Sequence, residues 1–248
     1  MDELTRNREP IPILTYHQIA EPASKGAPFR SLSVAPLDFE RQMTWLKFLG
    51  YQGLSMGDLM PYLRGERQGK VVGITFDDGY ANNLDYALPV LRRHGFSSTC
   101  YVVSQLLGQT NRWDREAGIA QVPLMPHEGL RQWVAAGQEV GAHTRHHVHL
   151  PQLDARTGYE EMALCKSELE AGLGVPVEHF CYPYGEYGPE HVAMAREAGF
   201  MTATTTRRGR CHAREDLLQL SRVPVLRSTT RPLLWLKVAT GYEDRRRT

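Results

Sequence analysis

The chain has 248 residues, of which 42% are hydrophobic, and this is enough for one large α/β domain with a buried core. Its 29 basic and 28 acidic residues leave a net charge of +1, so no strong field favours nucleic acid or an anionic membrane as a partner. The four cysteines show no Cys-x-x-Cys spacing, which is typical of a reducing compartment rather than a disulfide framework. These properties predict a single domain over residues 1–248.

The N-terminal residues 1–10 are polar and charged, without the apolar run of a signal peptide. No uncharged apolar stretch in the sequence is long enough to span a bilayer. The sequence as given therefore predicts a cytoplasmic protein with no membrane span. A signal removed from its N-terminus would instead make it extracytoplasmic.

In chain order, short apolar runs alternate with amphipathic stretches about seven times. Strands are predicted at residues 11–16, 71–76, 99–103, 139–144, 178–182, 200–206 and 218–226. Helices are predicted at residues 38–49, 55–64, 81–94, 128–136, 154–173, 189–198 and 232–239. Residues 18–35 are predicted to form a loop, and residues 106–126 an irregular segment with the character of a lid.

This alternation predicts a parallel sheet closed, or nearly closed, into a barrel with its helices outside. In such barrels the active site lies at the C-terminal ends of the strands. His17 ends the first predicted strand, Asp77 and Asp78 end the second, His143 ends the fourth, and residues 182–184 end the fifth. The rule thus places polar residues from four separate segments on one face of the barrel.

The chain is organised around the apolar run 71–76, which ends abruptly in Asp77, Asp78 and Gly79. Val, Ile, Thr and Phe favour a buried strand, and a glycine permits the sharp exit. Adjacent carboxylates repel each other unless a positive group stands beside them, and a metal ion is the obvious candidate. The alternative is that one aspartate only caps the following helix.

Two imidazoles, His143 and His147, follow the fourth predicted strand at a spacing of four residues. On a helical turn, residues at that spacing share one face. Two imidazoles and one carboxylate form a common three-ligand site for zinc or a similar divalent ion. The alternative is a solvated histidine-rich loop, because His146 and His149 lie in the same stretch. The aspartate pair at another strand end favours the metal site.

Together these two motifs resemble those of the polysaccharide deacetylases, carbohydrate esterase family 4 with the NodB homology domain. TFDDG at residues 75–79 matches the first motif of that family, and His143-Thr144-x-x-His147 matches its second. The resemblance extends from about residue 12 to about residue 225. It implies a distorted (β/α)7 barrel and a hydrolase that removes N-acetyl groups from an amino sugar or polysaccharide, releasing acetate.

The resemblance also implies roles for individual residues. Asp78, His143 and His147 match the metal ligands of the family, and Asp77 matches its general base. The implied cofactor is a divalent metal, with zinc first and cobalt or nickel as alternatives. The metal would lower the pKa of a bound water, and Asp77 would take its proton. A backbone N–H near Tyr184 would help to stabilise the oxyanion.

The chain departs from the family pattern at two motifs. The third motif usually reads Arg-x-Pro-Tyr, with the arginine orienting the base, whereas residues 181–184 read Cys-Tyr-Pro-Tyr. The late Leu-x-His, whose histidine is the general acid, is missing from residues 218–224. Both departures resemble the poly-N-acetylglucosamine deacetylase branch, in which an N-terminal Tyr-His supplies the acid, here His17. The alternative for His17 is a neutral histidine bonded to a neighbouring loop.

Four further residues are candidate substrate contacts: Trp113, Tyr182, Tyr184 and Arg222. The aromatic rings would stack on sugars, although aromatic residues near a barrel mouth often only pack. Arg222 would either pair with Asp77 in place of the missing arginine or form a surface salt bridge.

Two other functions fit the same residues. One is a related amidase or deformylase acting on a small amide or a lipid-linked sugar, which the missing secretion signal favours. The other is a carbohydrate-binding protein that has lost catalysis, and the intact Asp77, Asp78, His143 and His147 argue against it.

Overall fold

The structure is a computed structural model that describes residues 9–21 and 23–246, so most of the N-terminal stretch assessed for a signal peptide lies outside it. The strands are β1 (Ile13–Tyr16), β2 (Gln18–Ile19), β3 (Ser33–Val34), β4 (Gln52–Leu54), β5 (Val71–Phe76), β6 (Thr99–Val102), β7 (Glu139–Ala142), β8 (His179–Cys181), β9 (Thr202–Arg208) and β10 (Leu220–Pro224). The α-helices are α2 (Pro36–Phe48), α3 (Met56–Leu63), α4 (Asn82–His94), α5 (His127–Ala135), α6 (Ala155–Leu173), α7 (Pro189–Glu197) and α8 (Arg231–Ala239). Within the described ranges, no helix has both the length and the apolar character needed to cross a bilayer.

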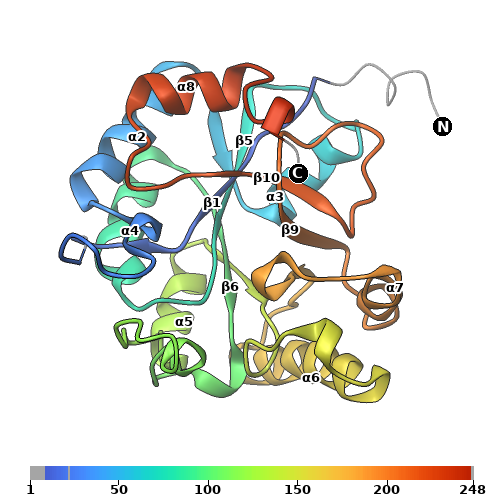
Figure 1. Cartoon of the computed structure of the whole chain (residues 1–248). Helices are drawn as coiled ribbons and strands as arrows, with labels where there is room; N and C mark the ends of the chain where they lie inside the picture. Colours follow the sequence, from blue (N-terminus) through green and yellow to red (C-terminus); the bar gives the residue numbers. More distant parts are fainter. Residues whose placement is uncertain (1–8, 22, 247–248) are drawn as a thin grey trace.

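Seven parallel strands form a closed barrel in the order β1-β10-β9-β8-β7-β6-β5, and pairing between β1 and β5 closes it. Figure 1 shows the helices arranged around these strands. The predicted distorted (β/α)7 barrel is therefore confirmed. The sequence analysis did not anticipate β4, which pairs with the first half of β5 outside this ring.

Strand β5 carries the two aspartates to the mouth of the barrel. All six of its residues are buried, as expected for a strand covered on both faces. Gly79 makes the exit possible because it adopts a φ of 78°, and a Cβ there would lie 3.0 Å from Val102 Cγ1. The chain then turns directly into α4, which leaves Asp77 and Asp78 at the strand tip.

Strand β1 lies beside β5, the strand that carries the aspartate pair. Tyr16 is in register with Phe76, and the backbone N–H of Asp77 donates to the Tyr16 carbonyl at 2.9 Å. This register places His17, the residue after β1, at the same edge of the barrel as Asp77.

Two long segments cover the barrel mouth, and we call them the first loop (residues 17–35, with residue 22 not described) and the second loop (residues 107–125). The first loop was predicted to be irregular, but it contains the short parallel pair β2–β3 and a 3-10 turn at Arg30–Leu32. The second loop has no regular strand or α-helix, as predicted. It folds around buried Asn111, whose side chain accepts from the Val122 N–H at 2.7 Å.

Candidate active site

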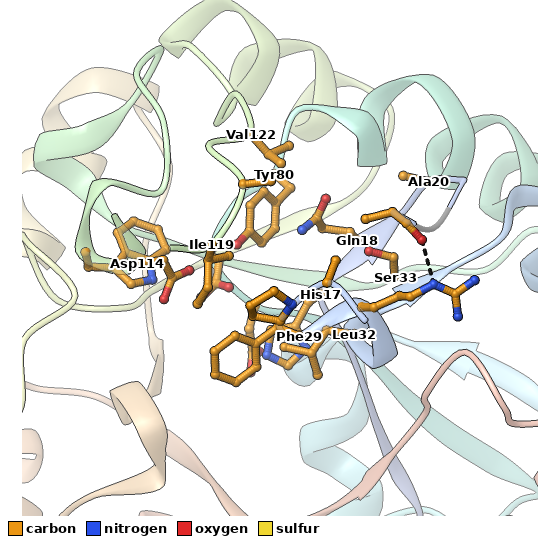
Figure 2. A pocket seen from close by; sticks show the side chains of 18 of the residues that line it. His17, Gln18, Ala20, Phe29, Leu32, Ser33, Tyr80, Asp114, Ile119 and Val122 are labelled. Atoms are coloured by element: carbon orange, nitrogen blue, oxygen red, sulfur yellow. Dashed lines mark hydrogen bonds between the residues drawn. The ribbon is translucent and has the colours of Figure 1, made fainter. Parts of the chain in front are cut away.

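A cavity of about 540 Å³ lies at the C-terminal ends of the barrel strands, between the two loops (Figure 2). Its volume falls within the range of small-molecule sites. The residues that line it include all the predicted site residues except Arg222: His17, Asp77, Asp78, Trp113, His143, His147, Tyr182 and Tyr184. The cavity therefore brings together the segments that the sequence predicted to lie at the C-terminal ends of the strands.

Asp78, His143 and His147 form a compact group of potential metal ligands. The Nε2 atoms of His143 and His147 lie 3.4 and 3.3 Å from Asp78 Oδ1, and one ligand atom from each residue lies within 4.8 Å of the others. Burial acts to raise the pKa of Asp78, but hydrogen bonds from the two imidazoles outweigh it and hold that pKa well below its usual value. A buried carboxylate with two imidazoles is a donor set suited to zinc and similar divalent ions.

The surroundings of the two histidines orient their rings. His143 Nδ1 lies 2.7 Å from the Cys181 carbonyl, so this nitrogen donates to the carbonyl and the ring turns its Nε2 toward Asp78. The Trp113 ring stacks on His147, with centroids 4.3 Å apart and planes at 19°. Both rings direct Nε2 toward Asp78, and this is the orientation that a metal ligand needs. These residues therefore fit a bound divalent ion.

The segment that carries the two histidines is not the helical turn that their spacing suggested. Strand β7 ends at Ala142, and Thr144 and His147 adopt positive φ values of 62° and 57°. The Thr144 Oγ1 accepts from the His147 N–H at 3.0 Å and closes a tight loop. Two left-handed residues, rather than one helical face, bring the imidazoles together.

Glu161 on α6 stabilises the segment of residues 143–147, which we call the histidine loop. No sequence pattern identified this residue. Its buried carboxylate accepts from the backbone N–H groups of Arg145 and His146, both at 3.0 Å. Its other oxygen lies 2.6 Å from His146 Nδ1. A carboxylate with three donors from one loop fixes the backbone between the two candidate ligands.

Asp77 is paired with Arg222 from β10. Arg222 Nη1 donates to Asp77 Oδ1 at 2.7 Å and Nη2 to Oδ2 at 2.8 Å, which is a bidentate pair. Burial acts to raise the pKa of Asp77, but the Arg222 guanidinium outweighs it, and the net pKa lies below the usual value. Arg222 is 2% exposed and lies behind the aspartate, where it takes the place of the arginine missing from residue 181.

His17 lines the cavity beside the aspartates, and Asn83 holds its backbone. The Asn83 side chain donates to the His17 carbonyl at 2.9 Å and accepts from the Ile19 N–H at 3.0 Å. Asn83 is fully buried in the first turn of α4. The aspartate strand and α4 thus fix the position of His17 from two sides. Sequence reasoning missed Asn83, because an asparagine there also suits an ordinary helix start.

The aromatic candidates occupy different environments. Tyr182 is buried, donates its hydroxyl to the Leu218 carbonyl at 3.1 Å and stacks on Tyr187, so most of it belongs to the packing. Tyr184 is partly exposed and stacks on His149, with centroids 3.9 Å apart. Burial raises the pKa of Tyr184 to about 12, so its hydroxyl stays protonated and can donate a hydrogen bond at neutral pH.

Backbone strain is concentrated at this site. Among the residues described, five non-glycine residues have a positive φ: Phe29, Asp78, Thr144, His147 and Tyr184. Four of them line the cavity, and Thr144 lies between the two histidines. Such conformations cost about 1–3 kcal/mol each and persist where the surrounding structure enforces them, typically at functional sites.

Comparisons with known proteins agree with this geometry. Residues 64–203, more than half of the chain, match the sequence profile of the family described as polysaccharide deacetylase. The chain is 29% identical over 217 residues to YxkH of Bacillus subtilis, covering 87% of this chain and 71% of that protein. It is 22% identical over 212 residues to the poly-beta-1,6-N-acetyl-D-glucosamine N-deacetylase of Staphylococcus epidermidis, covering 77% of this chain and 71% of that protein.

A solved structure with the same fold is the Streptococcus pyogenes deacetylase PplD in complex with acetate. The TM-score is 0.82 at 25% sequence identity, and the match covers 94% of this chain and 99% of that one. Fold, motifs and family profile therefore agree, and the chain belongs to the polysaccharide deacetylase family, with likeness to its poly-N-acetylglucosamine deacetylase branch.

Proposed function

We propose that this chain is a metal-dependent hydrolase that removes the acetyl group from an N-acetylated amino sugar and releases acetate. The observation that carries the proposal is the pairing of two carboxylates with different partners in one cavity. Asp77 is held by Arg222, whereas Asp78 faces His143 and His147. Neighbouring carboxylates in different environments are suited to different tasks.

Asp78, His143 and His147 would hold the divalent ion, with zinc as the first choice and cobalt or nickel as alternatives. Such an ion, when bound, supplies an activated water at neutral pH and polarises a carbonyl oxygen. Asp77 lies outside this ligand set and remains ionised because Arg222 lowers its pKa. It is therefore free to accept the proton of the attacking water.

The departing amine needs a proton, and we propose that His17 supplies it. Its ring lines the cavity next to the aspartates and its backbone is fixed by Asn83. Water adds to the amide carbon, the C–N bond breaks, and the amine nitrogen leaves with the proton of His17 while acetate remains. We propose that Tyr184 and a backbone N–H beside it contribute to binding the carbonyl oxygen.

Acetate release tests this function directly. The demetallated chain and the chain reconstituted with zinc, cobalt or nickel are incubated with N-acetylchitooligosaccharides and with poly-N-acetylglucosamine, and acetate is quantified. We expect release only with metal, and we expect H143A to lose stoichiometric metal. Full metal content in H143A, or undiminished release by the demetallated chain, would contradict the proposal.

His17→Ala should lower kcat on the amide strongly while leaving metal affinity nearly unchanged, because His17 is outside the ligand group. An activated acetate ester, whose leaving group needs little protonation, should be affected much less. The measurement is kcat for both substrates in the wild type and the variant.

The ester provides the internal control for His17. Equal losses on ester and amide would mean that His17 positions the substrate or supports the first loop. A variant with lost metal would mean that the site itself has been disturbed.

Glu161→Gln should weaken metal binding, at most by the about 10- to 100-fold that follows loss of a direct hydrogen-bond partner of a metal ligand, because Glu161 holds the backbone between His143 and His147 rather than a ligand itself. Both backbone N–H groups donate to the same Glu161 oxygen, and a glutamine oxygen could still accept them, but the amide carries no charge and presents an NH2 group to His146 Nδ1 in place of the second oxygen. Metal dissociation constants are measured by competition with a chromophoric chelator. E160Q is the matched control, since Glu160 is the adjacent residue and pairs with Arg156 on the exposed side of α6. Equal affinities for the two variants would contradict the bracing role.

A further inference from the structure

The catalytic cavity has two chemically different parts. The predicted catalytic and ligand residues occupy one part. The other is formed by the first and second loops, which contribute side chains that we call the apolar wall: Pro28, Phe29, Leu32, Ile119, Ala120 and Val122. Figure 2 shows Phe29 and Leu32 around His17, with Ile119 extending into the cavity from the second loop.

Two polar side chains in this second part have partners within the protein. The Asn82 amide nitrogen donates to Gln18 Oε1 at 3.1 Å, and Arg30 Nε donates to the Ala23 carbonyl at 2.5 Å, while Asn82 Oδ1 is buried with no hydrogen-bond partner among the described residues. A sugar ring placed against the apolar wall would leave the hydroxyl groups that face it without partners, and burying an unpaired hydroxyl is costly. An apolar group of the substrate and the apolar wall would both be removed from water without this cost.

The apolar wall lies on one defined side of the reaction. Phe29 and Leu32 belong to the loop that begins at His17, the residue proposed to protonate the departing amine. The part of the substrate next to His17 is the amino sugar rather than the acetyl group. A group that contacts the apolar wall is therefore attached to the sugar.

We propose that the substrate is an amino sugar carrying an apolar group on the sugar side, and that the apolar wall binds this group. The inference rests on the proposed deacetylase function and specifies its substrate class. Phe29 is the principal anchor, since it is 59% exposed at the cavity and held in the left-handed region with a φ of 52°. An exposed aromatic ring in a strained backbone conformation suits a binding role.

The test compares three N-acetylglucosamine substrates with the metal-loaded enzyme: the methyl glycoside, the octyl glycoside below its critical micelle concentration, and N-acetylchitotriose. We expect kcat/KM for the octyl glycoside to exceed that for the methyl glycoside about tenfold or more, because apolar contacts of a few methylenes give discrimination of that order. The trisaccharide should show no comparable gain.

Phe29→Ser should reduce the octyl-to-methyl ratio toward one. Phe48→Ser is the matched control, because Phe48 is 76% exposed on α2, outside the cavity, and should keep the ratio of the wild type. Acetate release with equal rates for octyl and methyl glycosides would overturn this inference and leave the deacetylase function intact. So would a ratio that Phe29→Ser leaves unchanged. Absence of release from all three substrates and from polymer would overturn the proposed function, and this inference with it.

Discussion

Replacing Asp77 with asparagine should lower kcat on an N-acetylated substrate by about 10²–10⁴-fold, the usual contribution of a general base. The amide has nearly the same shape but cannot take the proton of water. Metal content should be unchanged, because Asp77 is not part of the Asp78–His143–His147 group. The variant should still fold, although less stably than the wild type, because the buried Arg222 loses its counter-charge but keeps the Thr205 carbonyl at 2.9 Å and Thr75 Oγ1 at 3.1 Å as acceptors.

Three measurements check this expectation: acetate release at saturating substrate, elemental analysis and circular dichroism. Asp85→Asn is the control, because Asp85 is an exposed carboxylate on α4. A loss of less than about tenfold with the metal retained would mean that Asp77 is not the base, since tenfold is only about 1.4 kcal/mol of barrier.

Arg222→Met should destabilise the fold by about 3–5 kcal/mol, because it leaves the buried carboxylate of Asp77 without its counter-charge. Free energies of unfolding are measured by urea denaturation. The double variant D77N/R222M should recover a large part of this loss, since it removes the stranded charge together with its partner. R222K keeps the charge but not the bidentate geometry, and it should fall between wild type and R222M.

The pH dependence of stability distinguishes loss of the counter-charge in R222M from simple loss of packing. The folded pKa of Asp77 is lowered, so its contribution to stability is present above the pKa of the unfolded carboxyl and is lost as the pH falls through the folded pKa. R222M removes the strongest influence that opposes burial, so the pKa of Asp77 rises relative to the wild type and protonation on acidification relieves the buried charge. The stability gap between wild type and R222M should therefore narrow from pH about 7 to about 4. A gap that stays constant would contradict the charge mechanism.

The sequence correctly predicted those elements of the fold that local residue patterns specify. The run at 71–76 is a buried strand with the predicted bounds, and the turn after it depends on Gly79 as expected. The amphipathic stretch at 154–173 is α6, which begins with Asp154 accepting from the Thr157 N–H. Period and capping residues are local signals, and they are sufficient for such elements.

The errors lie where the chain breaks these patterns. The pairs β2–β3 and β4–β5 involve only two or three residues, which is too short to show an alternating pattern. The predicted helical turn between His143 and His147 was wrong, because a spacing of four suggests a helix whereas Thr144 and His147 are left-handed. Neither threonine nor histidine indicates such a conformation by its residue type. Tertiary contacts such as those of Glu161 enforce it.

The candidate site was only partly predictable for a related reason. Motif spacing placed Asp78, His143 and His147 near one another, but Asn83 and Glu161 act through contacts that no local pattern encodes. Arg222 had two possible partners in the sequence, and only the barrel places it behind Asp77, 145 residues away along the chain.

Barrel closure also has a consequence for the order in which the site is completed during synthesis. Strand β1 is held between β5 and β10, and Arg222 belongs to β10. A chain emerging from the ribosome therefore contains every residue of the Asp78–His143–His147 group long before the strand that fixes β1 and the carboxylate of Asp77. Contacts of such long sequence separation form late and slowly. Under the proposed function, a nascent chain holds all three candidate metal ligands before Asp77 has its partner Arg222, and hydrolysis would require the last strand to have joined the barrel.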